Sequence, residues 1–252
     1  MKSNWRLTTL LVFIFGSLAW MLSLSPIPQD NAFHLFADTR SWLGIPNFLD
    51  VMSNIPFLVA GLLGIKAVRE SKEQKPTTGW LVLFVGIVLV SAGSSYYHWS
   101  PDNATLVWDR LPMTVGFMGL FVALSTEYVD ARLLKWLLIP AIVLGVASVW
   151  YWHLTDDLRL YAWVQFMPLG SILIYLSLFK SRFSHGRLLL FALGFYILAK
   201  VTEIYDVAIF EAIGGVASGH TIKHLLAAGG CYALVIYIRK RQLISVIPEA
   251  DA

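Results

Sequence analysis

The chain has 252 residues, of which 57% are hydrophobic and only 14% are charged, and its mean hydropathy is +0.66. Soluble domains carry about 25% charged residues, so this composition excludes an ordinary water-soluble fold and indicates a surface that faces lipid. The net charge of +3 is small, and the single cysteine, Cys231, excludes an intrachain disulfide.

Runs of about 20 apolar residues predict membrane-spanning helices. Short polar connections separate most of these runs, and the longest connection, residues 25–46, is rich in Pro, Asp and Asn. We therefore expect an all-α polytopic membrane protein with a seven-transmembrane-helix core bundle plus one extra N-terminal helix. In chain order, the predicted spans are residues 5–24, 48–68, 80–98, 106–124, 133–152, 160–179, 188–209 and 220–238.

The first apolar segment has some features of a signal peptide. Lys2 and Arg6 precede the apolar stretch, and small residues follow it. The stretch is long for a signal peptide, however, and Pro26 stands where a mature chain would begin. We expect a retained helix, which gives three regions: an N-terminal transmembrane helix over residues 1–25, a seven-helix core over 26–241 and a short cytoplasmic tail over 242–252.

Lysine and arginine are distributed unequally over the two faces of the membrane. The N-terminus, every second connection and the C-terminal cluster that ends at Arg241 hold nearly all of them, whereas the opposite face holds only Arg40, Arg110 and Arg159. Positive charge gathers in cytoplasmic loops, so both termini are predicted to be cytoplasmic. In this interpretation the basic clusters orient the protein; they require no nucleic acid, and no protein partner is implied.

Polar residues gather at the predicted extracytoplasmic ends of three helices. The third helix ends with Ser94 and His98, the fourth begins near Asp109, and the eighth begins with His220 and His224. Because His220 and His224 are four residues apart, their imidazoles share one helix face and can bind one metal ion. Three histidines with one position open have the form of a catalytic zinc site. Taken singly, each histidine also fits an interfacial or hydrogen-bonded role.

At these residues the sequence resembles a known family. Three short motifs are similar to the signature of the alkaline ceramidases, and the segment from Asn47 to Asn54 supports the resemblance. The alkaline ceramidases belong to a superfamily of seven-helix membrane hydrolases that includes the adiponectin receptors. The resemblance covers roughly residues 38 to 240 and leaves the N-terminal helix outside it. The three motifs are Ser94-x-x-x-His98, Asp109-x-x-Pro112-Met113 and His220-x-x-x-His224.

The resemblance implies a zinc-dependent amidase that cleaves ceramide, a membrane lipid, into a sphingoid base and a fatty acid. In that family the residues matching His98, His220 and His224 hold zinc, and those matching Ser94 and Asp109 assist catalysis. The chemistry agrees, because zinc makes hydroxide available near neutral pH and a serine hydroxyl can stabilise an oxyanion. Asp109 has three candidate roles: general base, orienter of a zinc-bound imidazole, and helix cap.

The alkaline ceramidases also carry a calcium site, rich in carboxylates, before the first core helix. Here the corresponding stretch offers Asp38, Asn47 and Asp50, and Asn47 stands where the family usually has a glutamate. Because fewer charged oxygens weaken calcium binding, calcium is the weaker of the two metal predictions.

Charged residues also lie inside the predicted seventh and eighth helices. Lys200 and Glu203 are three residues apart and can pair, and Lys223 lies beside the histidine pair, within reach of Glu203 or Asp206 across helices. Two interpretations stay open, a neutralised packing pair and a lipid-headgroup site.

The sequence thus predicts a zinc-dependent membrane amidase that acts on a ceramide-like lipid. One alternative is the same site acting on another acyl lipid. A second is a seven-helix lipid receptor with structural zinc, but such a site is usually closed by four protein ligands. A transporter is disfavoured, because no paired broken helices occur in matching halves of the sequence.

Overall fold

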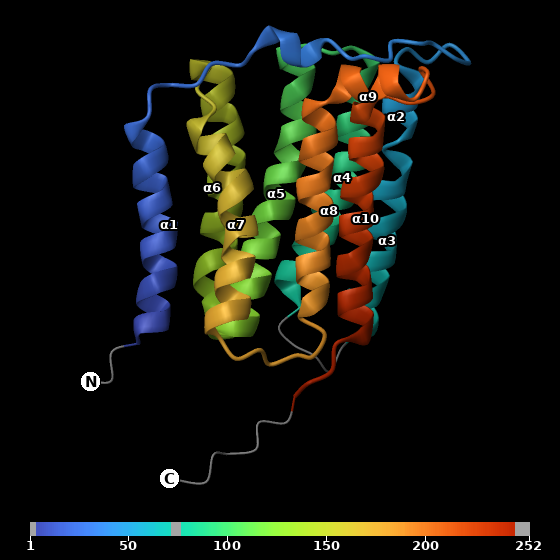
Figure 1. Cartoon of the computed structure of the whole chain (residues 1–252). Helices are drawn as coiled ribbons and strands as arrows, with labels where there is room; N and C mark the ends of the chain where they lie inside the picture. The colour runs from blue at the N-terminus through green and yellow to red at the C-terminus, as the bar shows by residue number, and fades with distance from the viewer. Residues whose placement is uncertain (1–3, 72–76, 245–252) are drawn as a thin grey trace, which may run out of the picture.

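The computed structural model describes residues 4–71 and 77–244, and this part of the chain is almost entirely helical (Figure 1). Its only β-structure is two isolated bridges, which confirms the predicted all-α fold. A short 3-10 helix covers Asn31–His34. The α-helices are α1 Trp5–Ser23, α2 Phe48–Met52, α3 Ile55–Glu70, α4 Thr78–Trp99, α5 Asn103–Tyr128, α6 Leu133–Thr155, α7 Arg159–Leu178, α8 Arg187–Ile204, α9 Asp206–Ala212 and α10 Gly219–Lys240.

The helices have the length and composition of membrane spans. In the described part of the chain, seven helical segments are long and apolar enough to cross a membrane, and the count becomes eight if α8 and α9 form one span. The helices α2 and α3 act together as one such segment, Phe48–Glu70, because only Ser53 and Asn54 separate them. These findings confirm a polytopic membrane protein. The predicted tail over 242–252 lies outside the described residues from residue 245 onward.

The predicted span over residues 188–209 is wrong at its C-terminal end. The helix α8 stops at Ile204, and the chain bends by 81° before α9 begins at Asp206. The bend coincides with tertiary hydrogen bonds, because the Asp206 carboxylate accepts the backbone amides of His220 at 2.7 Å and Ala37 at 2.9 Å. Apolar residues continue through the bend, so hydropathy alone does not reveal it.

The helices form a bundle in which α1 begins and α10 ends at the same end (Figure 1). Residues 24–47 connect α1 to α2 across the opposite end. The helix α1 packs on the side of the bundle, where the Trp163 indole donates to the Ser17 hydroxyl at 3.1 Å and Gly170 leaves room for the ring of Phe13. Retention of α1 after synthesis stays a prediction.

Small residues bring α4 and α5 close together. A Cβ atom on Gly86 would lie 2.7 Å from the backbone nitrogen of Gly116, and one on Gly119 would lie 2.6 Å from the backbone nitrogen of Leu83. Larger side chains at these positions would push the two backbones apart. The close contact therefore sets how the end of α4, which carries Ser94 and His98, faces the beginning of α5, which carries Asp109.

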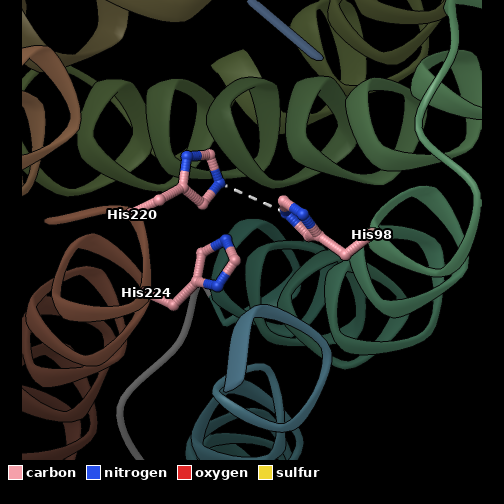
Figure 2. Close-up of side chains that lie close together, drawn as sticks. All are labelled: His98, His220 and His224. Atoms are coloured by element: carbon pink, nitrogen blue, oxygen red, sulfur yellow. Dashed lines mark hydrogen bonds between the residues drawn. The ribbon is translucent and has the colours of Figure 1, made fainter. Parts of the chain in front are cut away.

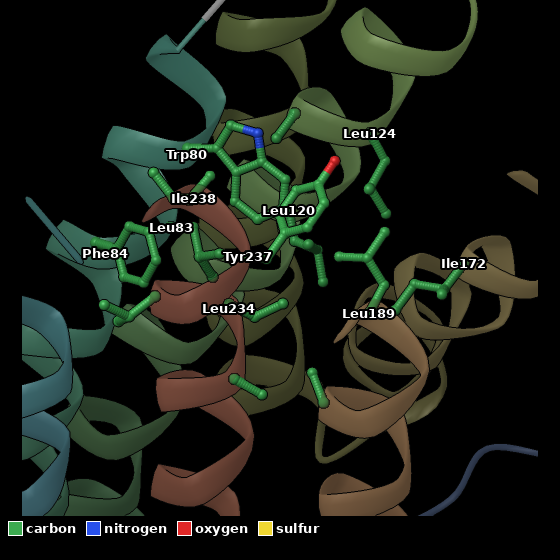
Figure 3. Packing of buried hydrophobic residues seen from close by; sticks show 14 of the residues in the cluster. Trp80, Leu83, Phe84, Leu120, Leu124, Ile172, Leu189, Leu234, Tyr237 and Ile238 are labelled. Atoms are coloured by element: carbon green, nitrogen blue, oxygen red, sulfur yellow. The ribbon is translucent and has the colours of Figure 1, made fainter. Parts of the chain in front are cut away.

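A large hydrophobic cluster fills the bundle toward the end where the termini lie; part of it, including Trp80, is seen in Figure 3. Beside it, Glu127 forms a buried ion pair with Arg241. The Trp80 indole and the Tyr237 hydroxyl also donate to Glu127, at 2.6 Å and 3.0 Å. Arg241, which follows the last turn of α10, thus lies at the end of the bundle where the termini lie, but its side chain is buried.

Candidate metal centre

Three histidines meet at the end of the bundle opposite the termini. His98 lies in the last turn of α4, and His220 and His224 lie in the first turns of α10; all three are at most 4% exposed. One ring nitrogen from each lies within 4.8 Å of the other two. Figure 2 shows the three rings turned toward one another, with Nε2 of His98 3.3 Å from Nε2 of His220.

The surroundings of two of the rings, His224 and His98, fit a metal ion. The Nδ1 atom of His224 lies 2.7 Å from the Ser53 hydroxyl, which leaves Nε2 of His224 for the centre. The Nδ1 atom of His98 is buried and has no hydrogen-bond partner. Buried polar atoms are normally satisfied, and imidazole nitrogens are preferred ligands of zinc. Three converging imidazoles, one with an unsatisfied nitrogen, therefore form a donor set that zinc fits.

The start of α10 is fixed by side chains that satisfy its free backbone amides. The Ser218 hydroxyl caps the helix by accepting from the backbone amide of Thr221 at 2.9 Å. The backbone amide of His220 donates to Asp206 at 2.7 Å, and the Thr221 hydroxyl donates to Asp50 of α2 at 2.5 Å. These contacts tie the first turn of α10 to α2 and α9, so both of its histidines are held in place.

The other two predicted catalytic residues lie beside the histidines. Ser94, one turn before His98 on α4, is 3% exposed, and its hydroxyl lies near the Asp109 carboxylate of α5. Both side chains and His224 line the same cavity. The structure thus brings together all five residues of the predicted zinc site.

Two of the three candidate roles for Asp109 lose support. The helix-cap role is wrong, because α5 begins at Asn103 and its cap is Asp102, which accepts from the backbone amide of Thr105 at 2.6 Å. Among the described residues, no hydrogen bond joins Asp109 to the three imidazoles, so the orienter role has no contact to carry it. The general-base role is compatible with its position on the cavity wall.

The cavity extends from the histidines into the bundle and has a volume of about 240 Å³. Its wall runs from Asp109 to Leu120 on α5 and from His224 to Leu234 on α10, which at 1.5 Å per residue is a depth of about 16 Å. Half of a bilayer's hydrocarbon core is about 15 Å thick. Below its polar end the lining is mainly apolar, so the cavity has the depth and chemistry to hold one acyl chain.

The three residues considered for calcium have other partners. Asp38 is held by Arg40 at 2.6 Å; burial alone would raise the pKa of Asp38, but hydrogen bonds from Arg40 hold it below its usual value. The Asn47 amide donates to the His98 carbonyl at 2.8 Å. Asp50 accepts from the Thr221 hydroxyl through Oδ1, whereas its Oδ2 is buried without a hydrogen-bond partner. Calcium at these residues stays a prediction.

The charged residues inside α8 and α10 form one cluster. Lys200 and Lys223 both donate to Glu203, the latter at 2.9 Å. Lys223 therefore pairs with Glu203 and not with Asp206, which is occupied by backbone amides. Lys223 also lies 2.9 Å from Nε2 of His220, so this cluster touches the metal centre.

Sequence reasoning missed Ser53 and Asp206 as supports of the histidines. Ser53 lies in the segment from Asn47 to Asn54, which resembles a known family, and this resemblance could have marked Ser53 as part of the site. Asp206 lies only three residues beyond Glu203 in a predicted apolar span. Since a carboxylate inside a span is normally functional or paired, its position could also have marked it as part of the site.

One comparison with known proteins found a match. The family model described as Ceramidase matches residues 44–251, which include every residue of the candidate metal centre. A search of curated proteins found no match. The family match begins just before α2, so α1 lies outside it.

Proposed function

Because the chain belongs to the Ceramidase family, we propose that it is a zinc-dependent hydrolase that cleaves ceramide into a sphingoid base and a fatty acid. Family membership supports a ceramide-hydrolysing amidohydrolase in general. The observation that carries the zinc-dependent mechanism is the convergence of three buried histidines at the polar end of a deep apolar cavity.

In this proposal His98, His220 and His224 hold the zinc ion, which supplies a Lewis acid and lowers the pKa of a bound water toward about 7. Asp109 accepts the proton of the attacking water and passes it to the leaving amine. The Ser94 hydroxyl, beside Asp109 on the cavity wall, donates a hydrogen bond to the oxyanion that develops on the carbonyl oxygen.

The cavity supports a membrane lipid as the substrate. The apolar wall between Asp109 and Leu120 suits an acyl chain, and the buried polar end suits the amide. In a bilayer, the acyl chains of a lipid lie in the hydrocarbon core and its polar group lies at the interface. A lipid can therefore enter this cavity while its chains and its polar group stay at the same levels in the membrane. The amide then lies beside the three histidines.

We also propose that the site faces the extracytoplasmic side, either periplasm or lumen, and that both termini are cytoplasmic. The support is the unequal distribution of Lys and Arg, together with the position of the histidines at the end of the bundle away from where α1 begins and α10 ends. The same site acting on another acyl lipid is the nearest alternative.

A receptor with structural zinc has less support. The group of residues that could hold a metal ion contains three ligands among the described residues. Structural zinc sites are almost always closed by four protein ligands, whereas catalytic sites keep one position open.

Mass spectrometry of the products tests the proposal. Purified protein in detergent micelles should convert ceramide into equal amounts of sphingoid base and fatty acid, and the His224→Ala variant should convert none. His153→Ala is a matched control, because His153 is an exposed histidine near the end of α6 and should leave conversion unchanged. Conversion by the His224→Ala variant at the parent rate would contradict the proposed site.

A further inference from the structure

Cations exceed carboxylates at the polar end of the cavity. Five charged residues line it: Asp109, Arg110, Lys200, Glu203 and Lys223. Three are cations and two are carboxylates, and the proposed metal ion adds further positive charge. Charges inside a membrane bundle are costly unless they are paired or used, so the excess calls for an anion.

One part of the excess positive charge comes from Lys200 and Lys223, which share the carboxylate of Glu203. The Glu203 side chain is only 15% exposed. The Lys223 ammonium has one further acceptor, Nε2 of His220, at 2.9 Å. A lysine ammonium has three N–H donors, and these two acceptors leave at least one donor of Lys223 free at the cavity, with or without a metal ion.

Arg110 supplies the other part. Its side chain is 5% exposed, and it forms no ion pair among the described residues. One guanidinium nitrogen, Nη2, donates to Gln29 at 2.7 Å, whereas Nη1 is buried without a partner. The guanidinium stacks on the rings of Trp152 at 4.1 Å and Tyr161 at 4.7 Å. Aromatic faces stabilise a cation but do not satisfy the hydrogen-bond donor of Nη1.

The other nearby carboxylates do not offset this charge within the cavity. Asp206 accepts the backbone amides of His220 and Ala37, and Asp50 accepts from hydroxyls at the start of α10. Neither side chain lines the cavity. A ligand in the cavity therefore meets Arg110 on the α5 wall and Lys223 on the α10 wall.

We propose that the cavity selects lipid amides that carry an anionic group, a carboxylate or a phosphate, on the amine side of the amide, and that Lys223 and Arg110 bind this group. The acyl side enters the apolar part, so only the amine side faces the cations. Unmodified ceramide offers neutral hydroxyls there, and an N-acyl amino acid or a phosphorylated ceramide offers the anion. Cleavage of such lipids rests on the proposed function, whereas their preferential binding does not.

Binding to metal-free protein tests the preference without any turnover. We would measure dissociation constants in neutral detergent micelles for two matched pairs: N-palmitoylglycine against N-palmitoylethanolamine, and ceramide 1-phosphate against ceramide. The anionic member of at least one pair should bind about tenfold or more tightly, the effect of one hydrogen bond to a charged group. The pair with the larger ratio identifies the anion as carboxylate or phosphate.

Variants then assign the preference to the two cations. Lys223→Gln and Arg110→Gln should each reduce the ratio several-fold or more, whereas Lys223→Arg and Arg110→Lys should keep most of it. The control is Lys66→Gln, which removes one positive charge at an exposed position on α3 and should leave the ratio unchanged. The charge-preserving variants keep the test valid if a glutamine variant does not fold.

Two results would overturn the proposal: equal binding of both members of each pair by the parent protein, or an unchanged ratio in the two glutamine variants. Hydrolysis, measured separately on zinc-loaded protein, distinguishes the two proposals. Cleavage of ceramide without any anionic preference in binding contradicts this inference alone. An anionic preference in binding without cleavage of any probe supports this inference and contradicts the proposed hydrolase function.

Discussion

The hydroxyl of Ser53, in the turn between α2 and α3, lies 2.7 Å from Nδ1 of His224 on α10. The same hydroxyl donates its one hydrogen to the Asp50 carbonyl at 3.1 Å, so it accepts a hydrogen bond from Nδ1–H of His224. This contact places the lone pair of His224 on Nε2, which faces the other two histidines. A residue that is distant in the sequence thus selects the tautomer that a metal ion requires.

Replacing Ser53 with alanine should therefore weaken metal binding without removing a ligand. We expect zinc affinity to fall by about 10- to 100-fold, the usual effect of losing a hydrogen bond to a metal-binding histidine. Competition with a chelator of known affinity measures the change. Ser148→Ala is the control, because Ser148 is also buried and donates to the backbone carbonyl of Gly145, in α6; a similar loss in that variant would contradict the role of Ser53.

The three histidines should hold about one zinc ion per chain. Alanine at His98, His220 or His224 should remove most of the metal and all amidase activity, because two imidazoles do not form a stable zinc site. Elemental analysis of purified parent and variants gives the metal content directly. Full zinc occupancy in both the His220→Ala and His224→Ala variants would show that the metal, if any, is held elsewhere.

Asp109 and Ser94 should affect rate more than metal content. Asp109→Asn removes the proton acceptor at nearly constant size, so zinc should remain and the rate should fall strongly. Ser94→Ala should be milder, with a loss of roughly 10²-fold, the scale of one oxyanion donor. Steady-state hydrolysis and zinc content of the same preparations check both. Parent rates in both variants would refute the roles given to these two residues.

The inner end of the cavity should limit the length of the acyl chain. Leu234 lines that end on α10, so Leu234→Trp should fill it and lower the rate with long-chain ceramides more than with short-chain ones. Leu225→Trp is the matched control, because Leu225 lies on the same helix but is 49% exposed on its outer face. Equal selectivity of the two variants, measured with a mixture of chain lengths, would argue against a chain in this cavity.

Membrane topology gives an independent test of where the site lies. A cysteine placed at Asn103, at the start of α5, should react with a membrane-impermeant reagent added from outside, in a background that lacks Cys231. A reporter fused after Arg241 should be cytoplasmic. Labelling of position 103 only after the membrane is permeabilised would reverse the orientation and the side from which substrate enters.

Much of the fold follows from local sequence, because a membrane span needs only length and apolar composition. The pairing of His220 with His224 also follows, since a spacing of four residues fixes a common helix face. The bend after Ile204 does not, because it coincides with hydrogen bonds between Asp206 and distant backbone amides. Ser53 is 171 residues from its partner His224, so only the folded structure reveals this contact.

The sequence positions of the charged residues also do not reveal which of these residues are buried or paired in the folded structure. Counting Lys and Arg assigns Arg241 to the same end of the bundle as the N-terminus, but its buried pairing with Glu127 depends on how the folded chain brings the ends of α5 and α10 together. Arg110 likewise counts as one of three outer-face cations in the sequence, and only its burial between Trp152 and Tyr161 reveals an unsatisfied donor beside the cavity.

The most direct test of the central claim is a zinc titration of chelator-treated protein with ceramide as substrate. Fatty acid release should be absent without metal, should rise in proportion to added zinc, and should stop rising at about one zinc per chain. Full release from protein shown by elemental analysis to contain no metal, with no gain on adding zinc, would contradict a zinc-dependent amidase held by His98, His220 and His224.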